Sequence, residues 1–153
     1  MRSSGVVARR QPHSPRRVPL RRATHRVHHH ERTDMVVRMA SDGDCLFHAL
    51  GYGTHQSAHQ VRARIVRHMA AHWHTSYEPF VPEAHRQGYL ARMQRSGTWG
   101  GELELRAHAH ASRECVLVHD TSRRVIARYG SRRDPARHLL YSDSHYDVIV
   151  PTS

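Results

Sequence analysis

The longest regular pattern in this sequence is a repeat of apolar residues in its middle. Val61, Ile65 and Met69 recur every four positions, which is the spacing of a helix that buries one face. Trp73 extends the same stripe. The pattern predicts a helix over residues 57–74 whose apolar side is ordinary core packing.

Three other segments are also predicted to be helices. They cover residues 45–50, 82–94 and 102–112. The segment from residue 82 opens with Pro82 and Glu83, and a fixed φ followed by a negative charge suits a first helical turn. The segment from residue 102 has acids in its first turn and small alanines that permit close packing.

Short runs of β-branched and apolar residues predict strands between polar turns. These runs are residues 35–39, 115–118, 125–129, 139–141 and 146–150. A turn around residues 120–122 makes the second and third runs a hairpin, while residues 130–137 form a charged loop. A second polar turn at residues 142–144 places His145 at the start of the last strand.

The first 34 residues differ in composition from the remaining 119. They hold nine of the 24 arginines and only two acids, a net charge of +7, whereas the rest carries +4. With few large apolar residues, this segment cannot bury enough surface to offset the entropy of ordering it. We expect a disordered basic arm over residues 1–34 and one folded domain over residues 35–153. The arm would bind nucleic acid, serve as a nuclear address, or be a merely solvated extension.

Several features of composition indicate an intracellular protein, cytoplasmic or nuclear. Cys45 and Cys115 are far apart in the chain, unlike the dense pairs of secreted scaffolds, so we expect no disulfide. The N-terminus lacks the apolar core of a signal peptide, and no run approaches the ~20 apolar residues that span a bilayer. We expect a monomer without membrane contact. All 24 basic residues are arginine. Codon bias would explain the absence of lysine, and so would avoidance of ubiquitin attachment, because ubiquitin is usually attached to lysine side chains.

A cysteine hydrolase needs a thiolate, a base and amide donors for the oxyanion. Cys45 opens a predicted helix, where unpaired N–H groups stabilise a negatively charged sulfur. The preceding turn, Asp42, Gly43 and Asp44, supplies backbone amides, and Gly43 permits angles or close approaches that other residues resist. The expected oxyanion donors are the amide of Cys45 and one amide of this turn.

His145 lies 100 residues after the cysteine, and the base of such a site is close in space rather than in sequence. Asp147 follows two positions later on the same predicted strand, so its carboxylate can reach a ring nitrogen of His145 and orient it. Because the chain has 17 histidines, one Cys–His pairing is weak evidence. These residues alone leave open a binding domain in which Cys45 is a buried structural residue.

Two other candidates are predicted to have no chemical role. Cys115 lies in an apolar strand and is predicted to be a small buried hydrophobe. The adjacent His28, His29 and His30 lack tetrahedral spacing and supporting groups, so we expect no structural zinc.

Three sequence blocks occur in a distinctive order. Residues 42–50 (DGDCLFHAL) look like an Asp-Gly-Asn/Asp-Cys-Leu-Phe-Arg-Ala nucleophile motif. Residues 98–105 (TWGGELEL) look like a Trp-Gly-Gly turn with its following helix, and residues 145–147 (HYD) like a His-aromatic-Asp/Asn block. In this order they resemble the OTU (ovarian tumour) family of deubiquitinating cysteine proteases. The short length of the chain resembles the compact viral OTU domains more than the larger cellular ones. His48 departs from the family's arginine, which would alter packing or a salt bridge and not the chemistry.

The resemblance implies a papain-like α/β (α+β) fold with a small central sheet flanked by helices. It implies a triad of Cys45, His145 and Asp147, with Asp42 holding the nucleophile loop. The substrate would be the C-terminal Gly-Gly tail of ubiquitin or a ubiquitin-like modifier, cleaved at its isopeptide bond to lysine without metal or cofactor.

The resemblance also suggests walls for a narrow substrate channel. Trp99, Gly100 and Gly101 would line one side and His145 with Tyr146 the other, although Trp99 would serve equally well as a core anchor. Two other functions stay open. One is an inactive OTU-like domain in a nucleic-acid-binding or localisation protein that uses its arm. The other is a module that holds ubiquitin without cutting it, against which the intact set of candidate catalytic residues argues.

Overall fold

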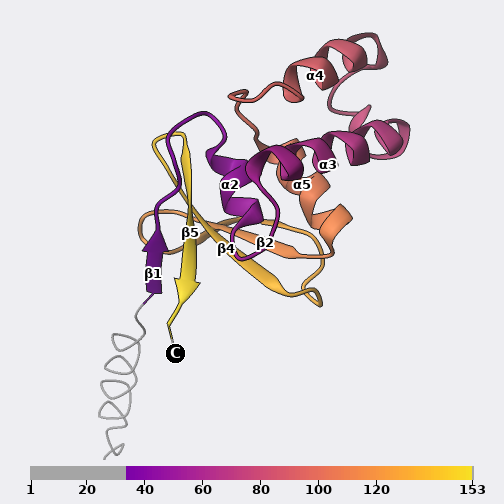
Figure 1. Cartoon of the computed structure of the whole chain (residues 1–153). Coiled ribbons are helices and arrows are strands. Elements are labelled where there is room, and N and C mark those ends of the chain that lie inside the picture. Colours follow the sequence, from indigo (N-terminus) through magenta and orange to yellow (C-terminus); the bar gives the residue numbers. More distant parts are fainter. Residues whose placement is uncertain (1–33, 153) are drawn as a thin grey trace, which may run out of the picture. The chain divides into compact units, whose positions relative to one another are not determined.

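The computed structural model describes residues 34–152, which form one mixed sheet with helices packed against it (Figure 1). The strands are β1 (Asp34–Val37), β2 (Cys115–His119), β3 (Val125–Tyr129), β4 (Ala136–Ser142) and β5 (His145–Pro151). Their order is β1-β5-β4-β2-β3, and only the β2–β4 pair is parallel. The expected α/β fold with a central sheet is confirmed.

Two helices pack directly on this sheet. The helical elements are α2 (Cys45–Gly51), α3 (Ala58–Ala71), the π-helix η1 (Trp73–Tyr77), the 3-10 helix η2 (Glu83–His85), α4 (Arg86–Met93) and α5 (Glu102–Ser112). Helix α2 contacts β5, and α5 contacts β2 and β3. Helix α3 packs on both α2 and α5, and α4 lies beyond α3 (Figure 1). None of the helices in residues 34–152 is both long and apolar enough to cross a bilayer.

The apolar stripe predicted for the longest helix is the centre of the core. Val61, Ile65 and Met69 on α3 are completely buried, and Trp73 is nearly so. The helix begins at a capping box, in which the Ser57 hydroxyl accepts from the Gln60 amide and the Gln60 side chain accepts from the Ser57 amide. It ends earlier than predicted, because a wider π turn starts at Trp73 and closes with a bond from the Glu78 amide to the Trp73 carbonyl at 2.8 Å.

The remaining elements follow the sequence predictions with local differences. The segment predicted as one helix from residue 82 is η2 followed by α4. The charged loop predicted over residues 130–137 is too long, because β4 already begins at Ala136, where the Cys115 amide bonds to the Pro135 carbonyl at 2.9 Å. Cys115 is buried, as predicted. The sheet also includes Asp34, which the sequence had assigned to the arm.

The other predictions for the arm, including its disorder, its nucleic-acid contacts and the lack of a zinc site at His28, His29 and His30, concern residues outside those that the structure describes.

Candidate active site

Cys45 is the first residue of α2, and the helix holds it at the edge of the core. Leu46, Phe47, Ala49 and Leu50 on the same helix are at most 1% exposed, so packing fixes the helix firmly. Cys45 itself is only partly buried and carries a free thiol. An immobile backbone therefore presents the sulfur to solvent.

The turn before the thiol has a geometry that only glycine supports. Gly43 has a φ of +83°, and a Cβ at this position would lie 2.4 Å from the Gly97 carbonyl oxygen. Asp42 closes the turn, since its Oδ1 accepts from the Asp44 amide at 2.9 Å. The Asp44 amide is thereby engaged, so the expected oxyanion donors that remain are the amide of Cys45 and that of Asp42 or Gly43.

Asp42 also contacts the residue that departs from the family motif. Its Oδ2 lies 3.0 Å from His48 Nε2, so the pair holds the turn to the helix that follows. Hydrogen bonds from His48 and from the Asp44 amide lower the pKa of Asp42. The residue that departs from the family motif therefore helps to hold the nucleophile turn.

Asp44 joins the nucleophile turn to the loop at residues 96–98. Its carboxylate accepts from the Gly97 amide at 2.9 Å, from the Ser96 hydroxyl at 2.8 Å and from Arg62. Burial alone would raise the pKa of Asp44, but these donors more than reverse that effect and lower it. The carboxylate is consequently ionised and fixed at neutral pH.

Arg62 is the cation behind this contact, and sequence analysis missed it. Its side chain is 2% exposed, lies 3.9 Å above the centroid of the Phe47 ring, and donates to the carbonyls of Met93 and Thr98, each at 2.8 Å. The signal for it was its position four residues before Val66, on the buried side of α3. Both loops beside the thiol thus depend on one buried ion pair.

His145 and Asp147 pair on β5 in the way their spacing predicts. His145 Nε2 lies 2.7 Å from Asp147 Oδ1. The Asp147 carboxylate is nearly buried and also accepts from the Met39 amide at 2.8 Å, with Arg38 Nε 3.5 Å away. Because Nε2 is engaged, Nδ1 is the ring nitrogen left to meet a thiol.

His145 starts its strand directly after a turn that constrains its position. Asp143 and Ser144 both have positive φ, and they link β4 to β5 in a tight antiparallel hairpin. Within residues 34–152 no hydrogen bond joins His145 to Cys45. The two residues are related through a shared pocket, since Ser144 and Tyr146, the neighbours of His145, line the same pocket as Cys45. A hydrogen bond between a catalytic thiol and its base often forms only when substrate is bound.

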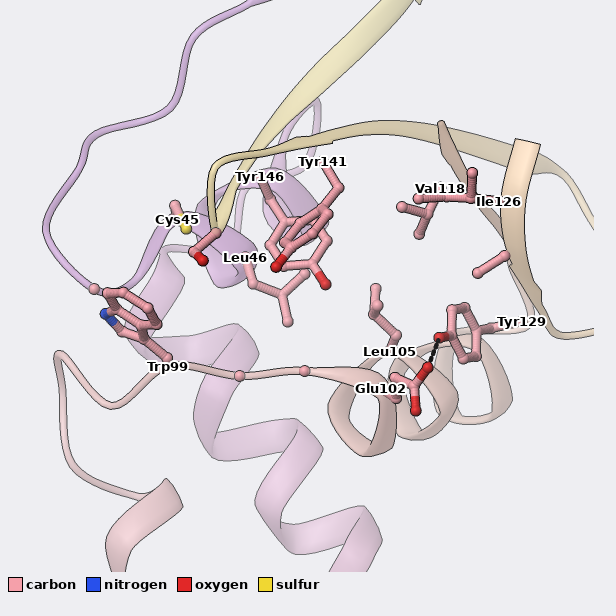
Figure 2. A pocket seen from close by; sticks show the side chains of 15 residues that line it. Cys45, Leu46, Trp99, Glu102, Leu105, Val118, Ile126, Tyr129, Tyr141 and Tyr146 are labelled. Carbon is pink, nitrogen blue, oxygen red and sulfur yellow. Dashed lines mark hydrogen bonds between the residues drawn. The ribbon is translucent and has the colours of Figure 1, made fainter. Parts of the chain in front are cut away.

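This pocket is lined by four of the five residues predicted for a substrate channel, while the fifth, His145, does not line it (Figure 2). Trp99 is 67% exposed, so the core-anchor alternative is wrong. A Cβ on Gly100 would fall 2.8 Å from the Phe47 ring, so only glycine lets this chain lie so close to α2. Sequence analysis missed further lining residues: Leu46, Glu102, Leu105, Val118, Ile126, Ala127, Tyr129 and Tyr141.

Two tyrosines form one wall of the pocket. Tyr141 and Tyr146 come from paired positions on β4 and β5, and their ring centroids are 4.8 Å apart (Figure 2). Burial raises the pKa of Tyr146, which keeps its hydroxyl neutral. This wall of the pocket is therefore aromatic.

Glu104, which sequence analysis also missed, holds the Trp-Gly-Gly turn from behind. This α5 residue is 2% exposed, its Oε1 accepts from the Gly101 amide at 2.7 Å, and its Oε2 accepts from the Tyr89 hydroxyl on α4. Burial raises the pKa of Glu104 despite these bonds. Glutamate three positions after a helix start is a known capping signal, which could have identified it.

Comparisons with known proteins identify the family to which this chain is similar. The family model of the OTU-like cysteine proteases matches residues 40–146. An OVARIAN TUMOR DOMAIN-containing deubiquitinating enzyme 7 of Arabidopsis thaliana is 26% identical over 121 residues, which cover 74% of this chain and 32% of that protein. The chain spans 32, 23 and 59% of the lengths of three such Arabidopsis relatives.

Solved structures with this fold include two OTU domains in ubiquitin complexes. The Hazara virus OTU bound to ubiquitin is 28% identical with a TM-score of 0.59, and the match covers 78% of this chain and 82% of that one. Another OTU domain in complex with ubiquitin is 20% identical with a TM-score of 0.69, covering 80% of this chain and 72% of that one. The family model spans both the thiol and its candidate base, and the chain belongs to the OTU-like cysteine proteases.

Proposed function

We propose that the protein is a deubiquitinating cysteine protease that hydrolyses the isopeptide bond after the C-terminal tail of ubiquitin or a ubiquitin-like modifier. One observation carries the proposal. Cys45 lines the same pocket as Ser144 and Tyr146, the two neighbours of His145, and the His145 imidazole is hydrogen-bonded to the Asp147 carboxylate. The names of the relatives support the substrate, because the Arabidopsis protein is a deubiquitinating enzyme and the Hazara virus domain is bound to ubiquitin.

In the proposed reaction Cys45 Sγ attacks the carbonyl carbon of the terminal glycine while His145 Nδ1 accepts the thiol proton. Asp147 holds the ring in this orientation and stabilises the imidazolium. The amides of Gly43 and Cys45 donate to the developing oxyanion. The intermediate collapses as His145 returns the proton to the lysine amine, which leaves, and a thioester remains on Cys45.

Water then completes the cycle. His145 accepts a proton from the attacking water, the oxyanion forms again at the same amides, and the thiolate leaves. The products are the free carboxylate of the modifier and the regenerated thiol. Every proton is transferred through His145, so no metal or cofactor is required for the proposed steps.

The shape of the pocket suits a tail that ends in two glycines. The chain at Gly100 and Gly101 presents backbone without side chains, and Trp99 lies on the same side of the pocket as Cys45 (Figure 2). A residue with a side chain just before the scissile bond would meet this backbone, while glycine would not. The proposed specificity for Gly-Gly tails rests on this close approach.

A ubiquitin probe with an electrophilic C-terminus tests the proposal. The wild type should be labelled with one probe per chain at Cys45, and Cys45→Ala should not react. Cys115→Ala is the matched control, because it removes the other, buried cysteine and should leave labelling intact. Equal labelling of Cys45→Ala and the wild type would overturn the proposal. His145→Ala should lose labelling by a factor of at least about 10².

The arm carries a separate proposal. We propose that residues 1–33 bind RNA or DNA through their arginines or direct the protein to the nucleus. Removing them should abolish salt-sensitive nucleic-acid binding and leave probe labelling unchanged. If nucleic-acid binding survives the deletion, it belongs to the folded domain.

A further inference from the structure

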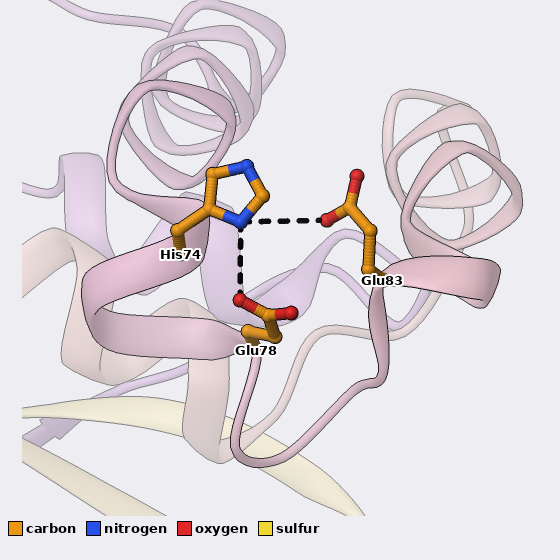
Figure 3. Close-up of side chains that lie close together, drawn as sticks. All are labelled: His74, Glu78 and Glu83. Carbon is orange, nitrogen blue, oxygen red and sulfur yellow. Dashed lines mark hydrogen bonds and ion pairs between the residues drawn. The ribbon is translucent and has the colours of Figure 1, made fainter.

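A cluster of potential metal-ligating side chains lies outside the thiol pocket, in the segment where η1 and η2 follow α3. His74 belongs to η1, Glu78 directly follows that element, and Glu83 opens η2 (Figure 3). His74 Nδ1 lies 3.0 Å from Glu78 Oε2 and 3.7 Å from Glu83 Oε2. The three potential ligand atoms all lie within 4.8 Å of one another.

The backbone around this cluster is firmly held. Trp73 and Tyr77, the first and last residues of η1, are each 1% exposed. The Glu78 amide bonds to the Trp73 carbonyl at 2.8 Å, and the His85 amide bonds to the Pro82 carbonyl at 2.8 Å. The three side chains therefore converge from a fixed frame, which reduces the entropy lost when a ligand binds them.

The two carboxylates point at the same nitrogen atom (Figure 3). A single N–H on Nδ1 makes one good hydrogen bond, so Glu78 at 3.0 Å uses it and Glu83 at 3.7 Å does not. The cluster brings two carboxylates to one imidazole nitrogen, and its neighbouring cation is Arg86, whose Nη1 lies 3.5 Å from Glu83 Oε1. A divalent cation would satisfy both carboxylates and the ring nitrogen together.

The donor set indicates which cation. One imidazole nitrogen with two carboxylate oxygens suits borderline transition metals, zinc foremost, and not magnesium or calcium. Zinc bonds of about 2.0–2.2 Å in a tetrahedron place ligand atoms roughly 3.4 Å apart, between the observed 3.0 and 3.7 Å. The third pair of ligand atoms, on Glu78 and Glu83, lies within 4.8 Å, so side-chain rotations of the two glutamates would complete the geometry.

We propose that His74, Glu78 and Glu83 bind a divalent transition-metal ion of the zinc type, with water at the remaining position. Arg86 orients Glu83 through its other oxygen, as supporting groups do around metal ligands. The ion would connect the end of η1 to η2 and α4. These last two elements contain only one buried residue, Met93, so few core contacts hold them in place. The role of the ion is structural, because none of the three ligands lines the thiol pocket.

Zinc titration of the full chain, after chelator treatment, tests this proposal by calorimetry and by thermal unfolding. Other histidines complicate the measurement, since His68 Nε2 and His110 Nδ1 lie 3.1 Å apart and the chain has 17 histidines in all. The variants are therefore His74→Ala and Glu83→Gln, and the matched control is His85→Ala, an exposed residue of η2 outside the cluster.

The wild type and His85→Ala should bind one more zinc equivalent than His74→Ala and should unfold at a higher temperature with zinc. Glu83→Gln should bind that equivalent at least about tenfold more weakly. Identical stoichiometry and affinity in all four proteins would overturn the proposal, because zinc would then be bound by the other histidines. Equal zinc-induced shifts in unfolding temperature for His74→Ala and His85→Ala would overturn it as well.

Discussion

Asp42 and Asp44 have identical side chains two positions apart, but the structure gives them unequal roles. Asp42 is about half exposed and pairs with His48, also an accessible residue. Asp44 is mostly buried and faces Arg62, which is almost entirely buried. An exposed pair contributes little to stability, whereas removing one member of a buried pair leaves an uncompensated charge.

We therefore predict that Asp44→Asn lowers the free energy of unfolding by about 3 kcal/mol or more, because it leaves the buried Arg62 guanidinium without a counter-charge. Asp42→Asn keeps an oxygen for the Asp44 amide and should change stability little. Urea unfolding monitored by tryptophan fluorescence provides the comparison. Equal losses in the two variants would show that Arg62 is not held by Asp44.

At this scale the sequence indicated the candidate catalytic groups more readily than the residues that position them. Cys45 and the His145–Asp147 pair stand in short motifs whose spacing has a direct geometric meaning. Arg62 meets the Met93 carbonyl, and Glu104 meets the Tyr89 hydroxyl, only when the helices pack together, although the Gly101 contact of Glu104 is local. No local pattern encodes a contact between residues 15 or more positions apart, so their roles required the fold.

At the scale of elements, the Trp-Gly-Gly turn is held in place by two helices. Glu104 on α5 accepts from the Gly101 amide and from Tyr89 on α4. Its removal would leave two buried donors unsatisfied and open a cavity behind the channel wall. The position of this wall relative to the thiol thus depends on a side chain that does not line the pocket.

Glu104→Ala should lower the free energy of unfolding by roughly 2–4 kcal/mol and raise KM for a ubiquitin substrate. Glu104→Gln should retain most of both properties, since its amide oxygen can accept from Gly101 and its NH2 can donate to the Tyr89 oxygen. Denaturant unfolding and steady-state kinetics measure the two effects. An alanine variant with wild-type KM would separate Glu104 from the channel.

The elements themselves were largely predictable, and the errors have a common cause. The stripe on α3 and the run of β-branched residues in β5 both reflect burial, so they are visible in the sequence. The start of β4 is not, because Ala136, Arg137 and His138 are polar or small and become a strand by pairing with β2 across about 20 residues. The π turn at η1 likewise leaves no periodic signal of its own.

At the scale of the whole molecule, one buried network joins three elements that are distant in sequence. Glu114, after α5, accepts from Arg137 on β4 at 2.9 and 3.1 Å and from His108 at 2.5 Å. Arg137 also donates to the carbonyls of Ala49 and Tyr52 at the end of α2. The network therefore fixes the nucleophile helix to the sheet that carries His145.

The ionisation of Glu114 makes this network sensitive to acid. Burial alone would raise the pKa of Glu114, but the bonds from His108 and Arg137 outweigh it and lower the pKa to about 2. Burial also lowers the pKa of His108, so at neutral pH this residue donates as a neutral imidazole and Arg137 supplies the charge. A carboxyl with a lowered native pKa stabilises the fold above its unfolded pKa of 4.5 and loses that contribution as the pH falls towards 2.

Glu114→Gln should therefore be less stable than the wild type at pH 7, by roughly 2 kcal/mol after allowance for its partial exposure, and the difference should shrink as the pH falls from about 4.5 to about 2. Urea unfolding at intervals between pH 7 and pH 2 measures both curves. Glu102→Gln, on the exposed start of α5, controls for the loss of any one carboxylate and should run parallel to the wild type. Should Glu114→Gln also run parallel, the carboxylate would not be ionised against Arg137 in the native state, and α2 would be held to β4 by the carbonyl bonds of Arg137 alone.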